Sequence, residues 1–151
     1  MTIWVDADSC PQAVREIIAR AAVKRRIKTV FAANTIIPIP DEDILEMAVV
    51  GKGEGVADQY IIDRAVEGDL AVTRDIPLAA ELVENRIVVI NDRGNHFTPE
   101  NIRERLSIRD LMKDFREIGI MPERESSFGR RETQLFAAAF DRELTKLLKS
   151  R

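Results

Sequence analysis

Short apolar runs alternate along this chain with longer stretches in which apolar residues recur every three or four positions. The runs are rich in Val, Ile and other β-prone residues, which predicts strands over residues 3–5, 29–32, 45–50, 70–73 and 87–90. The helical spacing predicts helices over 11–25, 56–66, 77–84, 98–118 and 131–148. Pro11 suits the first turn of the first helix, with Asp8 or Ser9 as its cap. An interruption is expected near Ser107.

Strands that alternate with helices, and that are apolar throughout, indicate a mainly parallel sheet covered on both faces. We therefore expect an α/β fold: a three-layer sandwich with about five strands. Residues 1–118 form the α/β domain, and residues 119–130, which contain Pro122 and two serines, form a linker. Residues 131–151 form an amphipathic C-terminal helix that packs on the domain or on a partner chain, the second case giving a homodimer.

Composition is that of an ordinary soluble protein, with 45% hydrophobic and 32% charged residues among 151. The net charge of −3 gives no argument for nucleic acid as a partner, although an acidic cluster could mask a basic rim. A single cysteine rules out an internal disulfide and fits a reducing compartment. No apolar run approaches the ~18 residues of a membrane span, and no signal region is present at the start. We expect a cytoplasmic protein without a membrane partner.

Polar residues stand where four of the predicted strands end. Asp6 follows the first strand, Asn34 the second, Asp75 the fourth and Asn91 the fifth. The carboxyl ends of parallel strands lie on one edge of the sheet, which is the edge where such folds bind ligands. A carboxylate at a buried strand end is costly to desolvate, and a cation would offset that cost. Asp6 is therefore the strongest candidate for a functional residue.

Two further acids belong to the same group, since Asp8 lies just beyond Asp6 and Asp58 opens a predicted helix. Converging carboxylates predict a site for Mg²⁺ or Mn²⁺, which suits hydrolysis at phosphorus. The structural alternative is that Asp8, Asp58 and Asp75 only cap or begin helices. Asp69 is expected at the surface.

Other polar side chains are weaker candidates. Cys10 is expected to be a packed, inert thiol, and His96 a loop residue. Asn91 and Arg93 either form a turn or face the site. One interpretation of the arginines is a basic rim that holds phosphates, formed by Arg93, Arg103, Arg105 and Arg109. The alternative for the last three is a solvated helix face.

Several strings resemble the YaiI/YqxD family of uncharacterised bacterial proteins, and together they cover nearly the whole chain. They are residues 3–11 (IWVDADSCP), 56–58, 68–70, 73–80, 91 with 93–94, 98–99 and 102–106. That family is similar to PIN-like nuclease domains, which carry an acid after strand one, an acid on a middle helix and Thr-x-Asp after strand four. Asp6, Asp58 and the pair Thr73 and Asp75 match those positions. Many PIN domains have a further Asp near strand five, where this chain has Asn91 and Asp92.

The resemblance implies a metal-dependent ribonuclease that hydrolyses RNA with a metal-activated water. Asp6, Asp58 and Asp75 would be catalytic and, with Asp8, would bind the metal. The predicted substrate-binding residues are Asn34, Thr73, Asn91, Arg93 and Arg103.

Two alternatives remain open. One is a metal- or RNA-binding module of the same fold without catalysis. The other is a phosphatase of the haloacid dehalogenase type, in which Asp6 would be the nucleophile and Asp8 the acid. The motif of that family has Thr or Val where this chain has Cys10, and the family needs a downstream lysine. No lysine occurs between Lys52 and Lys113.

Overall fold

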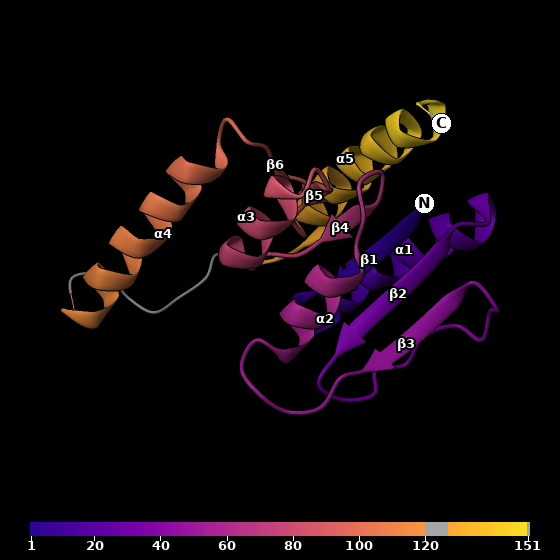
Figure 1. Ribbon diagram of the computed structural model, residues 1–151, viewed down its shortest axis with the longest axis horizontal. Coiled ribbons are helices and arrows are strands. Elements are labelled where there is room, and N and C mark those ends of the chain that lie inside the picture. The colour runs from indigo at the N-terminus through magenta and orange to yellow at the C-terminus, as the bar shows by residue number, and fades with distance from the viewer. Residues whose placement is uncertain (120–126, 151) are drawn as a thin grey trace.

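A computed structural model of the chain describes residues 1–119 and 127–150. Its centre is a six-stranded sheet with the order β3-β2-β1-β4-β5-β6 (Figure 1). β1 to β5 are parallel, and β6 pairs antiparallel with β5. The strands are β1 (Thr2–Asp6), β2 (Lys28–Ala33), β3 (Leu45–Val49), β4 (Leu70–Val72), β5 (Val88–Ile90) and β6 (His96–Phe97).

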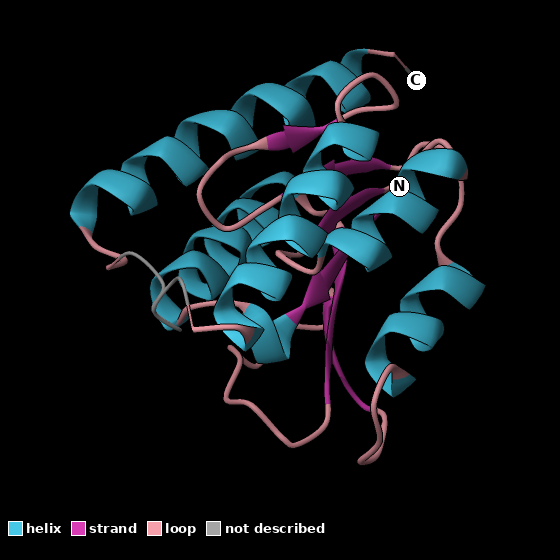
Figure 2. Cartoon of the chain, turned by 90° about the vertical axis from the view of Figure 1, so that its left-hand side faces the viewer, coloured by secondary structure: helices cyan, strands magenta, loops and turns pink. Residues whose placement is uncertain are grey.

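Helices lie on both sides of the strands, so the fold is the predicted three-layer α/β sandwich (Figure 2). One face packs against α1 and α5, and the other face packs against α2, α3 and the start of α4. The helices are α1 (Gln12–Arg25), α2 (Val56–Arg64), α3 (Ile76–Glu84), α4 (Ile102–Glu117) and α5 (Arg130–Lys149).

The two cores follow from the alternation of side chains along each strand. In β1, Ile3 and Val5 point into the α1/α5 core, whereas Trp4 points into the other core. In β2, Phe31 points into the α1/α5 core and Val30 points into the other core. Because both faces are covered, β4 and β5 are apolar at every position and the centre of β1 is apolar on both sides, as expected for a parallel sheet.

α5 packs on the sheet of its own chain. Phe136, Phe140 and Leu144 are at most 1% exposed and belong to the same core as β1. A homodimer through this helix stays a prediction and would have to use its outer face. The linker expected at 119–130 lies for the most part outside the described residues.

Local details differ from the sequence predictions for physical reasons. β6 has only two residues, too few for a periodic pattern. α4 runs through Ser107 without interruption. A 3-10 turn, Ala7–Ser9, separates β1 from α1, so the N-cap of α1 is Pro11 and neither Asp8 nor Ser9 caps it.

Asp69 is also not at the surface as predicted, since it is 4% exposed. Its carboxylate accepts hydrogen bonds from the Thr2 and Val66 amides and from Trp4 Nε1, at 2.9 to 3.0 Å. These three donors compensate the cost of burying the charge. They also tie the start of β1 to the start of β4.

Candidate functional site

The sheet has its topological switch between β1 and β4. From β1 the chain continues outward to β2 and β3, while β4 leads to β5 and β6 on the other side. Crevices at such points, outside the carboxyl ends of the strands, are the usual ligand sites of open α/β sheets. Here the crevice is a cleft of about 620 Å³. Its polar lining includes Asp6, Asp8, Ser9, Asn34, Glu54, Asp58, Arg74, Asp75 and Arg109.

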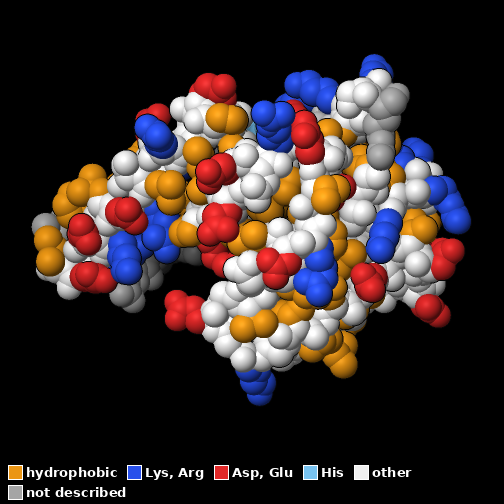
Figure 3. Space-filling model, in the orientation of Figure 1, with side chains coloured by type: hydrophobic (Ala, Val, Ile, Leu, Met, Phe, Trp, Pro, Cys, Tyr) orange, Lys and Arg blue, Asp and Glu red, His pale blue; other side chains and the backbone are white. Residues whose placement is uncertain are grey.

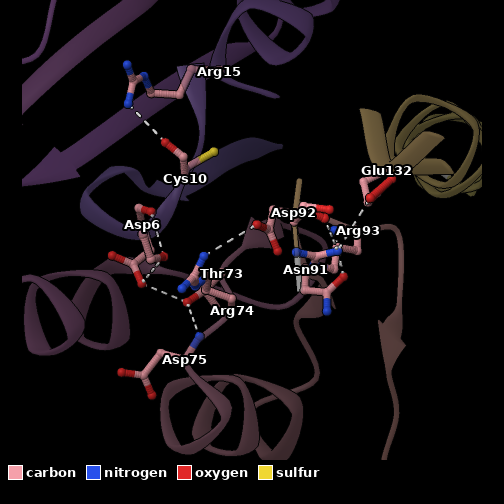
Figure 4. Close-up of polar contacts among 12 residues, drawn as sticks. Asp6, Cys10, Arg15, Thr73, Arg74, Asp75, Asn91, Asp92, Arg93 and Glu132 are labelled. Atoms are coloured by element: carbon pink, nitrogen blue, oxygen red, sulfur yellow. Dashed lines mark hydrogen bonds and ion pairs between the residues drawn. The ribbon is translucent and has the colours of Figure 1, made fainter. Parts of the chain in front are cut away.

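Asp6 lies at the floor of the cleft and is 6% exposed. Its Oδ2 accepts hydrogen bonds from Thr73 Oγ1 at 2.7 Å and from Ser9 Oγ at 3.1 Å. Burial raises the pKa of Asp6, the charges of Asp75 and Asp8 raise it further, and the two hydroxyls act against this rise. The carboxylate is thus held in one orientation in an environment where negative charge is unfavourable (Figure 4).

Asp75 follows β4 and stands at the N-cap of α3. Its Oδ1 accepts a hydrogen bond from the Leu78 amide at 3.0 Å, so the expected capping role is present. Its own amide donates to Thr73 Oγ1 at 3.0 Å. Thr73 therefore connects the backbone of Asp75 to the carboxylate of Asp6, and one hydroxyl fixes both positions.

Asp58 enters the cleft from the first turn of α2. Burial raises its pKa to about 6, with further contributions from the charges of Asp75 and Asp6 and from a hydrogen bond with the Asp75 side chain. Such a bond between two carboxyl groups needs one of them to be protonated. Three acids from β1, α2 and the β4–α3 turn thus influence one another electrostatically.

Asp8 and Asn34 close one side of the cleft. Asp8 Oδ2 accepts a hydrogen bond from the Asn34 amide at 2.8 Å, which joins the turn after β1 to the end of β2. The side-chain Oδ1 of Asn34 is buried and has no hydrogen-bond partner among the described residues. It is therefore an oxygen in the cleft wall that can still accept a bond or ligate a cation.

The donor set suits a hard cation, because carboxylate and amide oxygens are the ligands that Mg²⁺ and Mn²⁺ prefer. In the described residues, however, no three His, Cys, Asp or Glu side chains stand in an arrangement ready to hold a metal ion. One oxygen each of Asp6, Asp8 and Asp75 is already engaged by a hydrogen bond. Metal binding by these acids stays a prediction, and it requires a local adjustment of side chains.

Four of the five predicted substrate-binding residues do not line the cleft. Thr73 is one of them, since it is 2% exposed and its hydroxyl is bonded to Asp6. Asn91 Oδ1 accepts hydrogen bonds from the backbone amides of Arg93 and Asn95, both at 2.9 Å. Asn91 therefore forms a turn, the first of the two alternatives expected for it. Arg93 Nη1 lies 3.9 Å from Glu132 Oε1 of α5. Arg103 lines a separate depression between α3 and α4. Their role in substrate binding stays untested.

Arg74 and Arg109 also line the cleft. Arg109 was expected only as one of the four arginines of a basic rim, and Arg74 was not predicted. Arg74 Nη1 lies 3.8 Å from Oδ2 of the buried Asp92, which follows β5 (Figure 4). Its place inside the Thr73–Asp75 string is a signal that could have found it. Arg109 comes from α4, and the sequence left open whether it belongs to a phosphate-holding rim or to a solvated helix face, because its position depends on how α4 docks.

The nucleophilic alternatives gain little from the structure. Cys10 is 6% exposed, and burial raises the pKa of its thiol to about 12, as expected for a packed, inert residue. The cleft lining contains no lysine in the part of the chain that is described, although the phosphatase alternative needs one. No helix among the described residues is long and apolar enough to cross a membrane.

The fold and cleft define a three-layer α/β domain with an acidic site at the switch point of its sheet. The sequence profile of the YaiI/YqxD family, described as uncharacterised, matches residues 4–146. The chain belongs to this family.

Relatives named "UPF0178 protein" match almost from end to end. The protein of Treponema pallidum is 50% identical over 149 residues, 99% of this chain and 84% of the relative. That of Treponema denticola is 48% identical over 151 residues, 100% and 96% of the two chains. That of Myxococcus xanthus is 47% identical over 150 residues, 99% and 98%. No solved structure matches significantly, so the likeness to PIN domains stays an expectation.

Proposed function

We propose that the chain is a metal-dependent ribonuclease whose active site is the acidic cleft. The observation that carries the proposal is the convergence of Asp6, Asp8, Asp58 and Asp75 at the switch point of the sheet. These acids come from separate elements. The charges of Asp75 and Asp8 contribute to the raised pKa of Asp6, and those of Asp75 and Asp6 to the raised pKa of Asp58. Repulsion within such a cluster destabilises the metal-free protein. Acids with perturbed pKa values in a cleft are typical of functional sites.

Asp6, Asp58 and Asp75 would hold Mg²⁺ or Mn²⁺, with Asp8 and the Asn34 side-chain oxygen beside them. When bound, the cation would lower the pKa of a water and stabilise charge that develops on the phosphate. Thr73 and Ser9 keep the Asp6 carboxylate in a fixed orientation, which limits the rearrangement that ligation requires.

Two arginines favour a phosphate substrate over a neutral one. Arg74 and Arg109 line the cleft beside the acids, and guanidinium groups bind phosphate oxygens in bidentate fashion. Arg74 lies near Asp92, which supports its position over the cleft. Together they supply positive charge where the non-bridging oxygens of a phosphodiester would lie.

The test is cleavage of an end-labelled single-stranded RNA by the purified protein with Mn²⁺. Asp6→Asn should lower the rate by orders of magnitude, because an amide is a poorer metal ligand than a carboxylate. The matched control is Asp63→Asn on the exposed side of α2, where the Asp63 carboxylate accepts a hydrogen bond from Gln59 Nε2. This variant should cleave like the wild type.

Equal rates for Asp6→Asn and wild type would mean that a contaminating nuclease acts, and would contradict the proposal. Hydrolysis of small phosphate monoesters without action on RNA would favour the phosphatase. The absence of a ready metal arrangement in the described residues favours the non-catalytic module as the second candidate. Metal-dependent RNA binding without cleavage would establish it.

A further inference from the structure

α4 projects from the body of the domain (Figure 1), and most of its residues are exposed. Of its 16 described residues only Ile102, in the first turn, is buried. Ile108 and Leu111 are 45% and 48% exposed. A helix with so little packing is a weak contributor to the core, since helical stability in proteins comes mainly from a buried face. Its exposed surface therefore calls for another explanation.

The charges of α4 are divided between its two sides. Arg105, Arg109 and Arg116 are spaced by four and seven residues, so at 3.6 residues per turn they share one face. Arg103 projects from the opposite side of the helix. That opposite side also carries the acids Asp110, Asp114 and Glu117. We call the side with Arg105, Arg109 and Arg116 the arginine face.

The arginine face lines a groove of about 450 Å³, together with Ile76, Asn101, Glu104, Ile108 and Met112. Arg109 lines both this groove and the acidic cleft, so the two adjoin at this residue. Figure 3 shows a hollow between α4 and the body of the domain, with Lys and Arg atoms on the α4 side and Asp and Glu atoms opposite.

The arginines of this face have partners that a ligand can displace or share. Arg109 Nη1 lies 3.4 Å from Asp110 Oδ1, a pair whose side chains are 41% and 70% exposed. Exposed pairs of this kind contribute little and give way to a stronger ligand. The guanidinium of Arg105 lies 5.8 Å from the centre of the Phe97 ring, which positions its charge without consuming its hydrogen bonds.

We propose that the arginine face binds the sugar–phosphate backbone of a single-stranded nucleic acid whose reacting phosphate lies in the acidic cleft. This inference rests on the proposed function and adds the form of the substrate and its path. Arg105 and Arg116 are roughly 16 Å apart along the helix, the length of a few nucleotides. Ile108 and Met112 between them offer apolar contact to sugars and bases.

Single strands are favoured because Asp6 is only 6% exposed at the cleft floor. A phosphate must enter the cleft to reach it. One flexible strand can do so, whereas the backbone of a duplex is held on a stiff, wide helix.

The experiment measures binding of labelled single-stranded RNA in the Asp6→Asn background, by fluorescence anisotropy between about 50 and 200 mM salt. Arg116→Gln is the test, because Arg116 lies outside the cleft lining. Arg26→Gln is the control with the same charge change, because Arg26 follows α1 at the opposite edge of the sheet, and its pair with Asp43, at 4.0 Å, is exposed. The first should weaken binding severalfold and reduce the slope of log affinity against log salt by about 0.7. The control should leave both unchanged.

A triple variant of Arg105, Arg109 and Arg116 to Gln should reduce the slope by about 2. Circular dichroism melts ensure that all variants retain the fold. Equal losses in Arg116→Gln and Arg26→Gln would overturn the inference, because net charge alone would then explain them. If the protein bound duplex RNA more tightly than single-stranded RNA, the inference that the substrate is single-stranded would be wrong. An acidic polypeptide that binds through the same arginines, with no RNA bound, would assign the face to a protein.

These outcomes are separable from those of the proposed function. Binding that depends on Arg116, together with no cleavage by the wild type, contradicts the nuclease and supports the arginine face. Cleavage that depends on Asp6 but is insensitive to all three arginines, in both rate and salt dependence, supports the nuclease and overturns the arginine face.

Discussion

Replacing Asp58 by Asn should stabilise the metal-free protein at neutral pH. Burial and the neighbouring charges of Asp75 and Asp6 raise the pKa of Asp58 from 3.8 to about 6. The folded state then binds more protons than the unfolded state between these values. The free energy of unfolding therefore falls as the pH rises from about 4 to about 6, and stays low above that range. Asn carries no charge, and its amide can donate a hydrogen bond to Asp75.

The magnitude follows from the size of this rise in pKa. At full strength it corresponds to roughly 3 kcal/mol. Asp58 is only partly buried at the cleft wall, so solvent screening reduces the gain to about 1.5 kcal/mol. For a domain of this size, that gain raises the melting temperature by about 3–6 °C.

The assay is thermal unfolding of the wild type and Asp58→Asn with a chelator, at pH 7.5 and at pH 4. The gain should be present at pH 7.5 and nearly absent at pH 4, where the carboxyl is protonated in the folded protein. Asp63→Asn on the same helix should show no gain at either pH. A destabilised Asp58→Asn variant at pH 7.5, or the same gain at both pH values, would refute the electrostatic reasoning.

Three further predictions concern the cation, the hydroxyl beside Asp6 and the contact of α5. Mn²⁺ at a hundred times its dissociation constant should stabilise the wild type by about 2.7 kcal/mol in a thermal melt. Asp6→Asn or Asp75→Asn should lose most of this stabilisation, and a wild type whose melting temperature does not respond to Mn²⁺ would exclude the metal site. Thr73→Val should destabilise the protein by about 1–3 kcal/mol in denaturant unfolding, because the two hydrogen bonds of the Thr73 hydroxyl are lost. Thr73→Ser keeps the hydroxyl and should be nearly as stable as the wild type. Equal losses of stability in both variants would mean that the lost packing, and not the hydroxyl, causes the effect. Gly94→Ala should melt well below Gly68→Ala, since both have positive φ but only the Cβ at position 94 would overlap the backbone of α5; similar melting temperatures would contradict the docking of α5.

The strands and the acidic cluster could be predicted because their signals are local. β1 to β5 match apolar runs within one or two residues, and strand ends in a parallel sheet share one edge whatever the order of the strands. Asp6 and Asp75 could therefore be grouped before the sheet order was known. β6 could not be predicted, since its two residues are identified as a strand only by their pairing with β5.

The surroundings of the site depend on tertiary contacts that no window of sequence contains. Asp69 was expected at the surface, and only the meeting of β1 with the Val66 turn gives it three donors. The arginines of α4 show the same limitation. Periodicity divides them into faces, but only the docking of α4 shows that Arg109 meets the cleft and that Arg103 does not.

The order of the strands has a consequence for how the chain reaches its native state. β1 is central, yet its partner β4 lies far along the chain, with Ile3 opposite Leu70. The face of the sheet to which Ile3 and Val5 point is covered by α1 and by α5, and α5 follows all six strands along the chain. A nascent chain that ends before α5 would leave part of this apolar face of the sheet exposed. Such long-range pairing slows folding and leaves the intermediate prone to aggregation, so ribosome-bound chains should need chaperones until α5 has docked.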